Sequence, residues 1–418
     1  MPSRRDLLKA AAVAAATASS IGLGHRPAGA QAARSQIDGV LRQGVEARDA
    51  AGVVAMAATD KGVLYEGAFG RRELGKDAPM TLDTVVWIAS MTKAITATAA
   101  MQLVERGKLS LDAPAGQLAP GLAKAQVLEG FDAAGQPRMR APKRPITLRH
   151  LLTHTAGFGY EIWRTEIATY QTATNTPGIT TCTNAALTTP LLFDPGEGWE
   201  YGINIDWVGK IVEAASGQKL DAYLQQNVLG PLGMKDTSFK LSASQRARQA
   251  SVHQRDENGA LAPIEFALPE DPEFLMGGGG LNGTAPDYLA FTQMILHGGR
   301  LNGAQVLRPE TVEQMAQNHI GPLEVGAMKS AMPGLSNDVE LFPGTSTKWG
   351  LSFVINTAAL PTGRAAGSLA WAGLANTYFW IDRSRRVCGV FLSQLLPFYD
   401  QTAIELLTKF ETEVYRAL

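Results

Sequence analysis

The stretch Val85-Val86-Trp87-Ile88-Ala89-Ser90-Met91-Thr92-Lys93 determines how the rest of the sequence is interpreted. Its first five residues form a short apolar run rich in β-branched side chains, which favours a strand. After Ser90, residues suited to a buried helix face recur at steps of three and four: Met91, Ala94, Ile95, Thr98, Met101 and Val104. The pattern predicts a strand that leads into a helix, with Ser90 at the N-cap or in the first turn.

Ser90 and Lys93 have the spacing of a nucleophile and its base. The free N–H groups and the dipole of a helix N-terminus favour developing negative charge. Lys93 lies three residues on, so its amine is on the same helix face as the Ser90 hydroxyl. A lysine can accept the serine proton when burial or nearby charge lowers its pKa. The alternative is an ordinary helix start with a solvated lysine. A second match, Ser216 to Lys219, contains Gly217 and is typical of a helix C-terminus.

Length and charge restrict the class of protein. The 418 residues, 45% of them hydrophobic, can bury a substantial core and allow two domains. The formal net charge of -1 and the lack of a long basic run indicate no nucleic-acid partner. After the N-terminal segment, no apolar run has membrane-spanning length, so we expect no stable membrane insertion of the mature chain.

Residues 1–30 have the pattern of a twin-arginine signal peptide. Ser3-Arg4-Arg5-Asp6-Leu7-Leu8-Lys9 precedes an Ala-rich stretch, and Ala28-Gly29-Ala30 gives a small-residue cleavage site before Gln31. The sequence therefore predicts recognition by the twin-arginine export machinery and a periplasmic or secreted enzyme. Such substrates leave a reducing cytoplasm already folded, so we expect Cys182 and Cys388 to be free structural thiols, although an oxidising compartment would permit a disulfide.

The order of strand and helix patterns predicts an α+β fold. An antiparallel sheet flanked by helices is expected from residues 31–115 and 284–418, with a mainly helical domain, 116–283, inserted between them. The Pro/Gly-containing loop 321–347 is a candidate rim for the site. Expected strands are 52–57, 63–69, 349–356, 368–372, 376–381 and 387–394, and expected helices include 205–216, 219–228, 286–297 and 402–417.

Three further segments carry candidate site residues. His150 and His154 could present two ligands to a metal, but no third ligand is evident, so we expect no metal site. Tyr201 lies in a turn-rich approach to a helix, where its phenol could enter a cleft or simply pack. The strand Leu369 to Leu374 ends in Gly373, which would let a substrate carbonyl approach backbone N–H groups; alternatively, it is an ordinary core strand.

Several motifs together resemble those of the penicillin-recognising serine hydrolases. This superfamily includes class C β-lactamases, D-alanyl-D-alanine carboxypeptidases, family VIII carboxylesterases and the related acyltransferase of statin biosynthesis. The resemblance implies a β-lactamase/transpeptidase-like fold. The matching motifs are Ser90-Met91-Thr92-Lys93, Leu148-Arg149-His150-Leu151-Leu152-Thr153-His154-Thr155-Ala156-Gly157, Val228-Leu229-Gly230-Pro231-Leu232-Gly233-Met234-Lys235-Asp236-Thr237 and Thr377-Tyr378-Phe379-Trp380-Ile381-Asp382.

The resemblance implies a role for each matching residue. Ser90 would be the acylated nucleophile, and Lys93 and Tyr201 would act as general base and acid, in an order that the sequence leaves open. The backbone N–H groups of Ser90 and Leu374 would form the oxyanion hole. The resemblance implies no metal or organic cofactor.

Two departures from the pattern concern substrate binding. Trp371-Ala372-Gly373 stands where β-lactamases of this type have Lys-Thr-Gly, and Ile203 occupies the amide-binding position, with Asn204 one residue off and expected to point elsewhere. Both changes remove polar anchors for a carboxylate or an amide. We therefore expect Trp371, Gly373 and Ile203 to line a site for neutral esters with apolar groups.

The sequence thus predicts a cofactor-free serine carboxylesterase that hydrolyses short- to medium-chain esters through a Ser90 acyl-enzyme. An acyltransferase of the same mechanism and a β-lactamase or D,D-peptidase are the alternatives among enzymes. An inactive ligand-binding protein on this scaffold is the alternative of another class, and the presence of Ser90, Lys93 and Tyr201 together argues against it.

Overall fold

The computed structural model describes residues 28–418. Residues 1–27, which hold most of the predicted signal peptide, lie outside the described residues, and Ala28 to Ala30 begin helix α1 (Ala28–Glu46). Export and location therefore stay predictions. No helix in the described part of the chain is long and apolar enough to cross a membrane.

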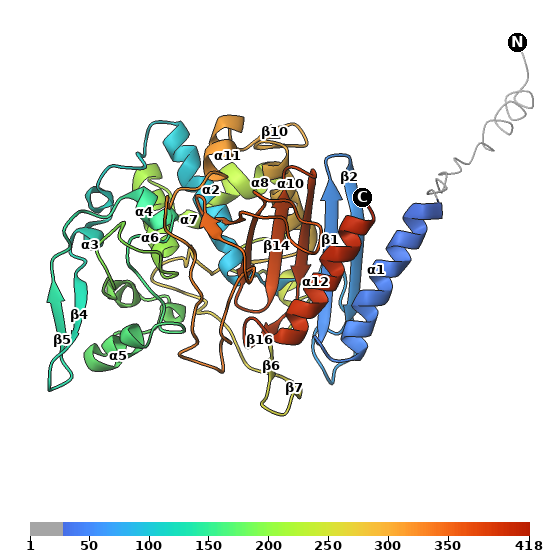
Figure 1. Ribbon diagram of the computed structural model, residues 1–418, viewed down its shortest axis with the longest axis horizontal. Helices are drawn as coiled ribbons and strands as arrows, with labels where there is room; N and C mark the ends of the chain where they lie inside the picture. Colours follow the sequence, from blue (N-terminus) through green and yellow to red (C-terminus); the bar gives the residue numbers. More distant parts are fainter. Residues whose placement is uncertain (1–27) are drawn as a thin grey trace, which may run out of the picture.

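A seven-stranded antiparallel sheet forms the centre of the fold, in the order β11-β12-β13-β14-β15-β1-β2 (Figure 1). β1 pairs with β15 from Val54 opposite Leu392 to Thr59 opposite Val387, so the two ends of the chain share one sheet. This confirms the predicted α+β, β-lactamase-like fold. The strands are β1 (Gly52–Thr59), β2 (Gly62–Gly70), β11 (Thr347–Trp349), β12 (Val354–Asn356), β13 (Leu369–Gly373), β14 (Thr377–Asp382) and β15 (Val387–Leu392).

Helices cover both faces of the sheet because alternate side chains of its strands are apolar on both sides. On β14, Trp380 packs against Phe410 of α12 (Gln401–Arg416), which lies beside α1 across β1 and β2 in Figure 1. The next residue, Phe379, faces the other way and contacts Tyr288 of α10 (Ala285–Leu296). Gly389 lies opposite Trp380, and a Cβ at this position would collide with the indole ring.

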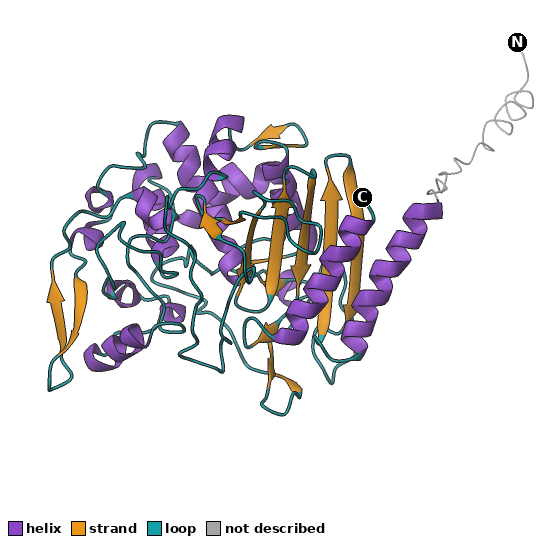
Figure 2. Cartoon of the chain, viewed as in Figure 1, coloured by secondary structure: helices purple, strands orange, loops and turns teal. Residues whose placement is uncertain are grey.

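The part of the chain between β2 and α10 contains mostly short helices and loops (Figure 2). A turn over residues 132–136 joins β4 to β5, and β6 pairs with β16 of the C-terminal part. The elements are β3 (Val86–Trp87), α2 (Thr92–Glu105), α3 (Pro120–Ala123), β4 (Val127–Phe131), β5 (Pro137–Arg140), α4 (Leu148–Leu152), α5 (Thr165–Thr174), α6 (Asn204–Ser216), α7 (Leu220–Leu224), α8 (Gly230–Leu232), α9 (Ala243–Arg246), β6 (His253–Arg255), β7 (Leu261–Pro263) and β8 (Asn282–Gly283). After α10 come β9 (Arg300–Leu301), β10 (Ala304–Gln305), α11 (Pro309–Met315) and β16 (Leu395–Leu396).

Two predicted elements were wrong in extent. The single strand 349–356 is a tight hairpin of β11 and β12, because Ser352 adopts a left-handed φ of 73° and Gly350 N–H donates to the Phe353 carbonyl. The helix 219–228 ends as α7 at Leu224 and continues as a π-helical turn, Gln225–Leu229.

Cys182 and Cys388 are both free and buried, which confirms the prediction of free thiols. Burial raises the pKa of each thiol to about 12, so neither is a reactive thiolate at neutral pH.

Candidate active site

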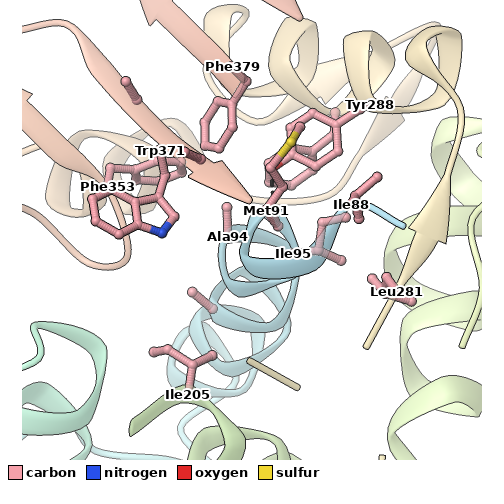
Figure 3. Packing of buried hydrophobic residues seen from close by; sticks show 14 of the residues in the cluster. Ile88, Met91, Ala94, Ile95, Ile205, Leu281, Tyr288, Phe353, Trp371 and Phe379 are labelled. Atoms are coloured by element: carbon pink, nitrogen blue, oxygen red, sulfur yellow. Dashed lines mark hydrogen bonds between the residues drawn. The ribbon is translucent and has the colours of Figure 1, made fainter. Parts of the chain in front are cut away.

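Ser90 lies in the 3₁₀ turn Ala89–Met91 that leads directly into α2, which confirms its predicted first-turn position. The preceding Ala89 has a left-handed φ of 45°, a strained conformation for a residue with a side chain. The surrounding core holds this turn: Figure 3 shows Ile88, Met91 and Ile95 at the start of α2, packed among buried residues that include Tyr288 and Phe379. Ser90 itself is partly exposed, so a substrate can reach its hydroxyl.

Lys93 is buried and faces the Ser90 hydroxyl. Its Nζ donates to Ser90 Oγ at 3.1 Å, to Tyr160 Oη at 3.1 Å and to the Gly278 carbonyl at 2.6 Å. Burial holds the pKa of Lys93 well below its ordinary value, against the opposing negative charge of Asp206. A neutral amine keeps its N–H donor to Gly278 and can direct its lone pair at Ser90 Oγ. The geometry therefore suits Lys93 as the base that takes the serine proton.

Asp206 is a buried acid that the sequence analysis did not assign to the site. It lies in the first turn of α6, and its Oδ1 accepts from Gly278 N–H at 2.8 Å. Burial raises the pKa of Asp206, while the positive charge of Lys93 lowers it. Gly278 thus connects the two groups, since its N–H contacts Asp206 and its carbonyl contacts Lys93.

The run Gly277-Gly278-Gly279-Gly280 lets neighbouring segments, including the start of α6, pack closely against its backbone. None of its four residues has a positive φ, so unusual dihedral angles are not the reason for the glycines. A Cβ on Gly278 would lie 2.5 Å from Asp206 Oδ2, and one on Gly277 would lie 3.1 Å from the Ile205 carbonyl. The glycine run in the sequence therefore indicated that another group packs closely against this segment. The sequence did not show that this group is Asp206.

Tyr201 lies against Lys93 within an aromatic cluster. The Lys93 Nζ is 4.7 Å from the centroid of the Tyr201 ring, and Trp371 Nε1 donates to Tyr201 Oη at 3.0 Å. Burial raises the pKa of Tyr201, against the opposing effect of hydrogen bonds with Ser90 and Trp371. The phenol therefore keeps its proton at neutral pH and can donate it. The rings that surround Tyr201 are those of His154, Tyr160, Trp163, Trp199 and Trp371.

Tyr160 and the loop 321–347 complete this cluster. Tyr160 was not predicted, because no local pattern distinguishes it from the other tyrosines, yet its hydroxyl is a direct partner of Lys93. Trp163, which packs on Tyr201, donates through Nε1 to Ser336 Oγ of the loop at 2.9 Å. The loop therefore contacts the site through its aromatic wall, and its role at the rim stays a prediction.

The end of β13 lies against the Ser90 turn. Gly373 permits this approach, because a Cβ there would collide with the Ile88 carbonyl and with Thr377 Oγ1. Leu374 packs against the small cluster formed by Trp87, Ala89 and Ala375. An oxyanion hole made by the N–H groups of Ser90 and Leu374 stays a prediction.

The predicted substrate-binding residues Trp371 and Ile203 are deeply buried, at 6% and 1% exposed. Trp371 has an additional function that the sequence did not indicate, as the donor to the Tyr201 phenol. The Nδ2 of Asn204 donates to His154 Nδ1 at 2.9 Å. Contact of substrate with Trp371, Gly373 and Ile203 stays a prediction.

The two histidines of the LRHLLTH motif have separate structural roles. His150 Nδ1 accepts from Thr147 N–H in the capping box of α4, whereas His154 binds the segment around Tyr201. Within residues 28–418, no group of three metal-ligating side chains comes together.

The serine turn, the buried lysine and tyrosine and the adjoining strand end define an enzyme of the serine hydrolase and acyltransferase class. The chain matches the family model described as Beta-lactamase over residues 37–409, and it belongs to this family.

Characterised relatives include both transferases and esterases. The chain is 33% identical to the monacolin J acid methylbutanoyltransferase of Aspergillus terreus, over 90% of this chain and 94% of that protein. It is also 33% identical to the lovastatin esterase of Penicillium rubens, over 84% of this chain and 91% of that protein. The structure of simvastatin synthase (LovD) from Aspergillus terreus, as its LovD6 mutant, matches with a TM-score of 0.81 and 31% identity, covering 94% and 98% of the two chains.

Proposed function

We propose that this enzyme transfers an acyl group from an ester to an alcohol through a Ser90 acyl-enzyme, and that ester hydrolysis is the slower fate of the same intermediate. The observation that carries the proposal is the 3.1 Å hydrogen bond between Lys93 Nζ and Ser90 Oγ in a buried site. The similarity to a methylbutanoyltransferase favours transfer over the hydrolysis that the sequence alone suggested.

The reaction follows from the protonation states of the site. Neutral Lys93 takes the proton of Ser90 as Oγ attacks the ester carbonyl, and the N–H groups of Ser90 and Leu374 stabilise the oxyanion. Tyr201 gives its proton to the departing alkoxide, and the proton held by Lys93 then returns to Tyr201. In the second half, an acceptor alcohol loses its proton to the same pair and attacks the acyl carbonyl, which releases Ser90 and a new ester.

The burial of the site supports transfer over hydrolysis. Lys93 and Tyr201 are only 1% and 2% exposed, and aromatic rings surround the phenol. An apolar wall of this kind favours an apolar alcohol over water as the acceptor of the acyl group. It also favours donors with apolar acyl groups and no carboxylate.

The test is a partition experiment with p-nitrophenyl butyrate and a series of added alcohols. Release of p-nitrophenol measures acylation, while chromatography separates butyric acid from the new butyrate ester of each alcohol. We expect the ratio of ester to acid to exceed the molar ratio of alcohol to water at least about tenfold, as binding of the acceptor implies. An ester-to-acid ratio equal to the molar ratio of alcohol to water would show that the enzyme does not bind the acceptor alcohol, and would contradict the proposal of an acyltransferase.

A carboxylesterase is the second candidate, favoured by the equal identity to the lovastatin esterase. It predicts butyric acid as the main product with every alcohol tested. We further propose that the enzyme works in the periplasm or outside the cell, as the twin-arginine pattern of residues 1–30 indicates.

A further inference from the structure

His154 is a fully buried histidine that the proposed chemistry does not use. It follows α4 and has a left-handed φ of 57°, a conformation that is uncommon for residues other than glycine and asparagine. Its ring lies 4.8 Å from the ring of Tyr201, measured between centroids. His154 and Tyr201 are far apart in the sequence, so this is a tertiary contact.

His154 binds the segment around Tyr201 at three points. Its carbonyl accepts from Glu200 N–H at 2.8 Å. Its Nδ1 faces two donors, Asn204 Nδ2 at 2.9 Å and the Gly202 N–H at 3.4 Å. The bonds therefore fall on both sides of Tyr201 in the chain.

The two donors define the form of the imidazole. A nitrogen that accepts hydrogen bonds carries no proton, so His154 is the neutral tautomer with its proton on Nε2. Burial, together with the charge of Lys93, holds the pKa of His154 well below its ordinary value. Both effects favour the neutral imidazole, in which Nδ1 accepts the two hydrogen bonds.

We infer that His154 is a positioning residue for Tyr201: by accepting hydrogen bonds at Nδ1 it fixes the 200–204 turn and holds the phenol beside Lys93 and Ser90. The inference rests on the proposed acyl-enzyme function, in which Tyr201 moves protons. A displacement of about 1 Å in such a group can reduce the rate about 100-fold. This positioning role requires only a hydrogen-bond acceptor where Nδ1 lies, and it does not require that the side chain titrate.

Three substitutions separate this acceptor from the bulk of the ring. His154→Asn puts an amide oxygen where Nδ1 lies, and asparagine tolerates the left-handed backbone. His154→Gln carries its polar group one atom further, at the place of Nε2, and His154→Leu removes it. We expect kcat within about threefold of wild type for the Asn variant, and about 100-fold lower for the Gln and Leu variants. KM should change less than about threefold in all, because His154 is buried away from solvent.

His150→Asn is the matched control. His150 lies in α4, one turn before His154, and its Nδ1 bond to Thr147 N–H caps that helix. The asparagine oxygen can accept the same bond from Thr147 N–H, so this variant should keep both Tm and kcat close to wild type. Each protein is assayed well below its own Tm, with circular dichroism as the measure of folding, so a loss of stability is not mistaken for a loss of rate.

The comparison of Asn with Gln decides the inference even where the Leu variant does not fold. Equal kcat values for the Asn and Gln variants, or wild-type kcat in a folded Leu variant, would overturn it. Failure of the proposed function would have a different signature, since a fluorophosphonate would then leave no covalent phosphonyl adduct on Ser90 of the wild-type protein.

Discussion

Lys93 and Tyr201 have their pKa values shifted in opposite directions by the same cause. Burial disfavours the charged form of each group, so the lysine loses its proton more readily and the tyrosine keeps it. The sequence left the base unassigned between the two residues. With Lys93 Nζ at 3.1 Å from Ser90 Oγ, we assign the first proton transfer to Lys93 and the second to Tyr201.

Asp206 offers a direct test of this assignment through the pH dependence of kcat/KM. The rate should rise with pH as Lys93 loses its proton. The negative charge of Asp206 raises the pKa of Lys93, so Asp206→Asn, which keeps an acceptor for Gly278 N–H, should lower that pKa. The acid limb should therefore move to lower pH, as measured with p-nitrophenyl butyrate. An unmoved limb, or one at higher pH, would contradict the assignment.

Replacement of Ser90 by Ala should abolish acyl transfer and hydrolysis while the protein stays folded. No side-chain cap of α2 is lost, because the Ser90 hydroxyl does not bond to the helix backbone. Loss of one hydrogen bond from Lys93 should cost about 1 kcal/mol in the free energy of unfolding. Ser216→Ala, in the second Ser-x-x-Lys match, is the control and should keep the wild-type rate. Turnover by a folded Ser90→Ala protein would exclude Ser90 as the nucleophile.

Substrate preference should follow from the side chains at positions 371 and 203. A β-lactam brings a carboxylate and an amide, and an unpaired buried polar group costs about 1–3 kcal/mol, or one to two powers of ten in rate. Trp371 and Ile203 offer no partner of the required charge. We expect kcat/KM for p-nitrophenyl butyrate to exceed that for nitrocefin at least about 100-fold. Comparable values for the two substrates would contradict this interpretation.

For individual site residues, the sequence predicts contacts between positions that lie close together along the chain. Ser90 and Lys93 were recognised from a spacing of three residues, and Tyr201 from the family resemblance. Tyr160, which lies 67 positions from Lys93, and the Trp371 bond to Tyr201, which spans 170 positions, depend on tertiary contacts that no local pattern encodes.

The glycine run between α9 and α10 is an element whose composition has a direct catalytic consequence. Gly278→Ala would place a Cβ 2.5 Å from Oδ2 of the fully buried Asp206. The Gly278 carbonyl should shift away from Lys93, and we expect both Tm and kcat to fall. Gly39→Ala in α1, where nothing lies within 4 Å, should instead raise the free energy of unfolding by about 0.5–1 kcal/mol. An active, equally stable Gly278→Ala protein would refute the close-approach explanation.

Elements with a strong period were predicted well, and irregular ones were not. The helices predicted at 286–297 and 402–417 are α10 and α12, each shifted by one residue, because buried faces fix their period. The strand predicted at 349–356 is a hairpin, because a left-handed residue reverses the chain where the pattern is continuously apolar. The order of strands in the sheet also lay beyond the sequence, since pairing partners are far apart along the chain.

For the whole molecule, the predicted destination outside the cytoplasm is open to a simple test. Replacement of Arg4-Arg5 by Lys-Lys should leave the precursor in the cytoplasm, because the twin-arginine machinery recognises the arginine pair. Cell fractionation and N-terminal sequencing measure the outcome, with an exported form that begins near Gln31. Undiminished export of the Lys-Lys variant would exclude this route.

Because β1 pairs with β15, the first strand of the sheet must wait for its partner while the rest of the chain is synthesised. Asp60 and Arg386, which form an ion pair at the ends of these two strands, are 326 positions apart. At about 5–20 residues per second, a ribosome needs roughly 15–65 s to make the intervening chain. Throughout that interval one edge of the β1–β2 hairpin has no partner, and an open strand edge is a template for aggregation. The nascent chain therefore exposes this edge of β1 until its last strands have been made.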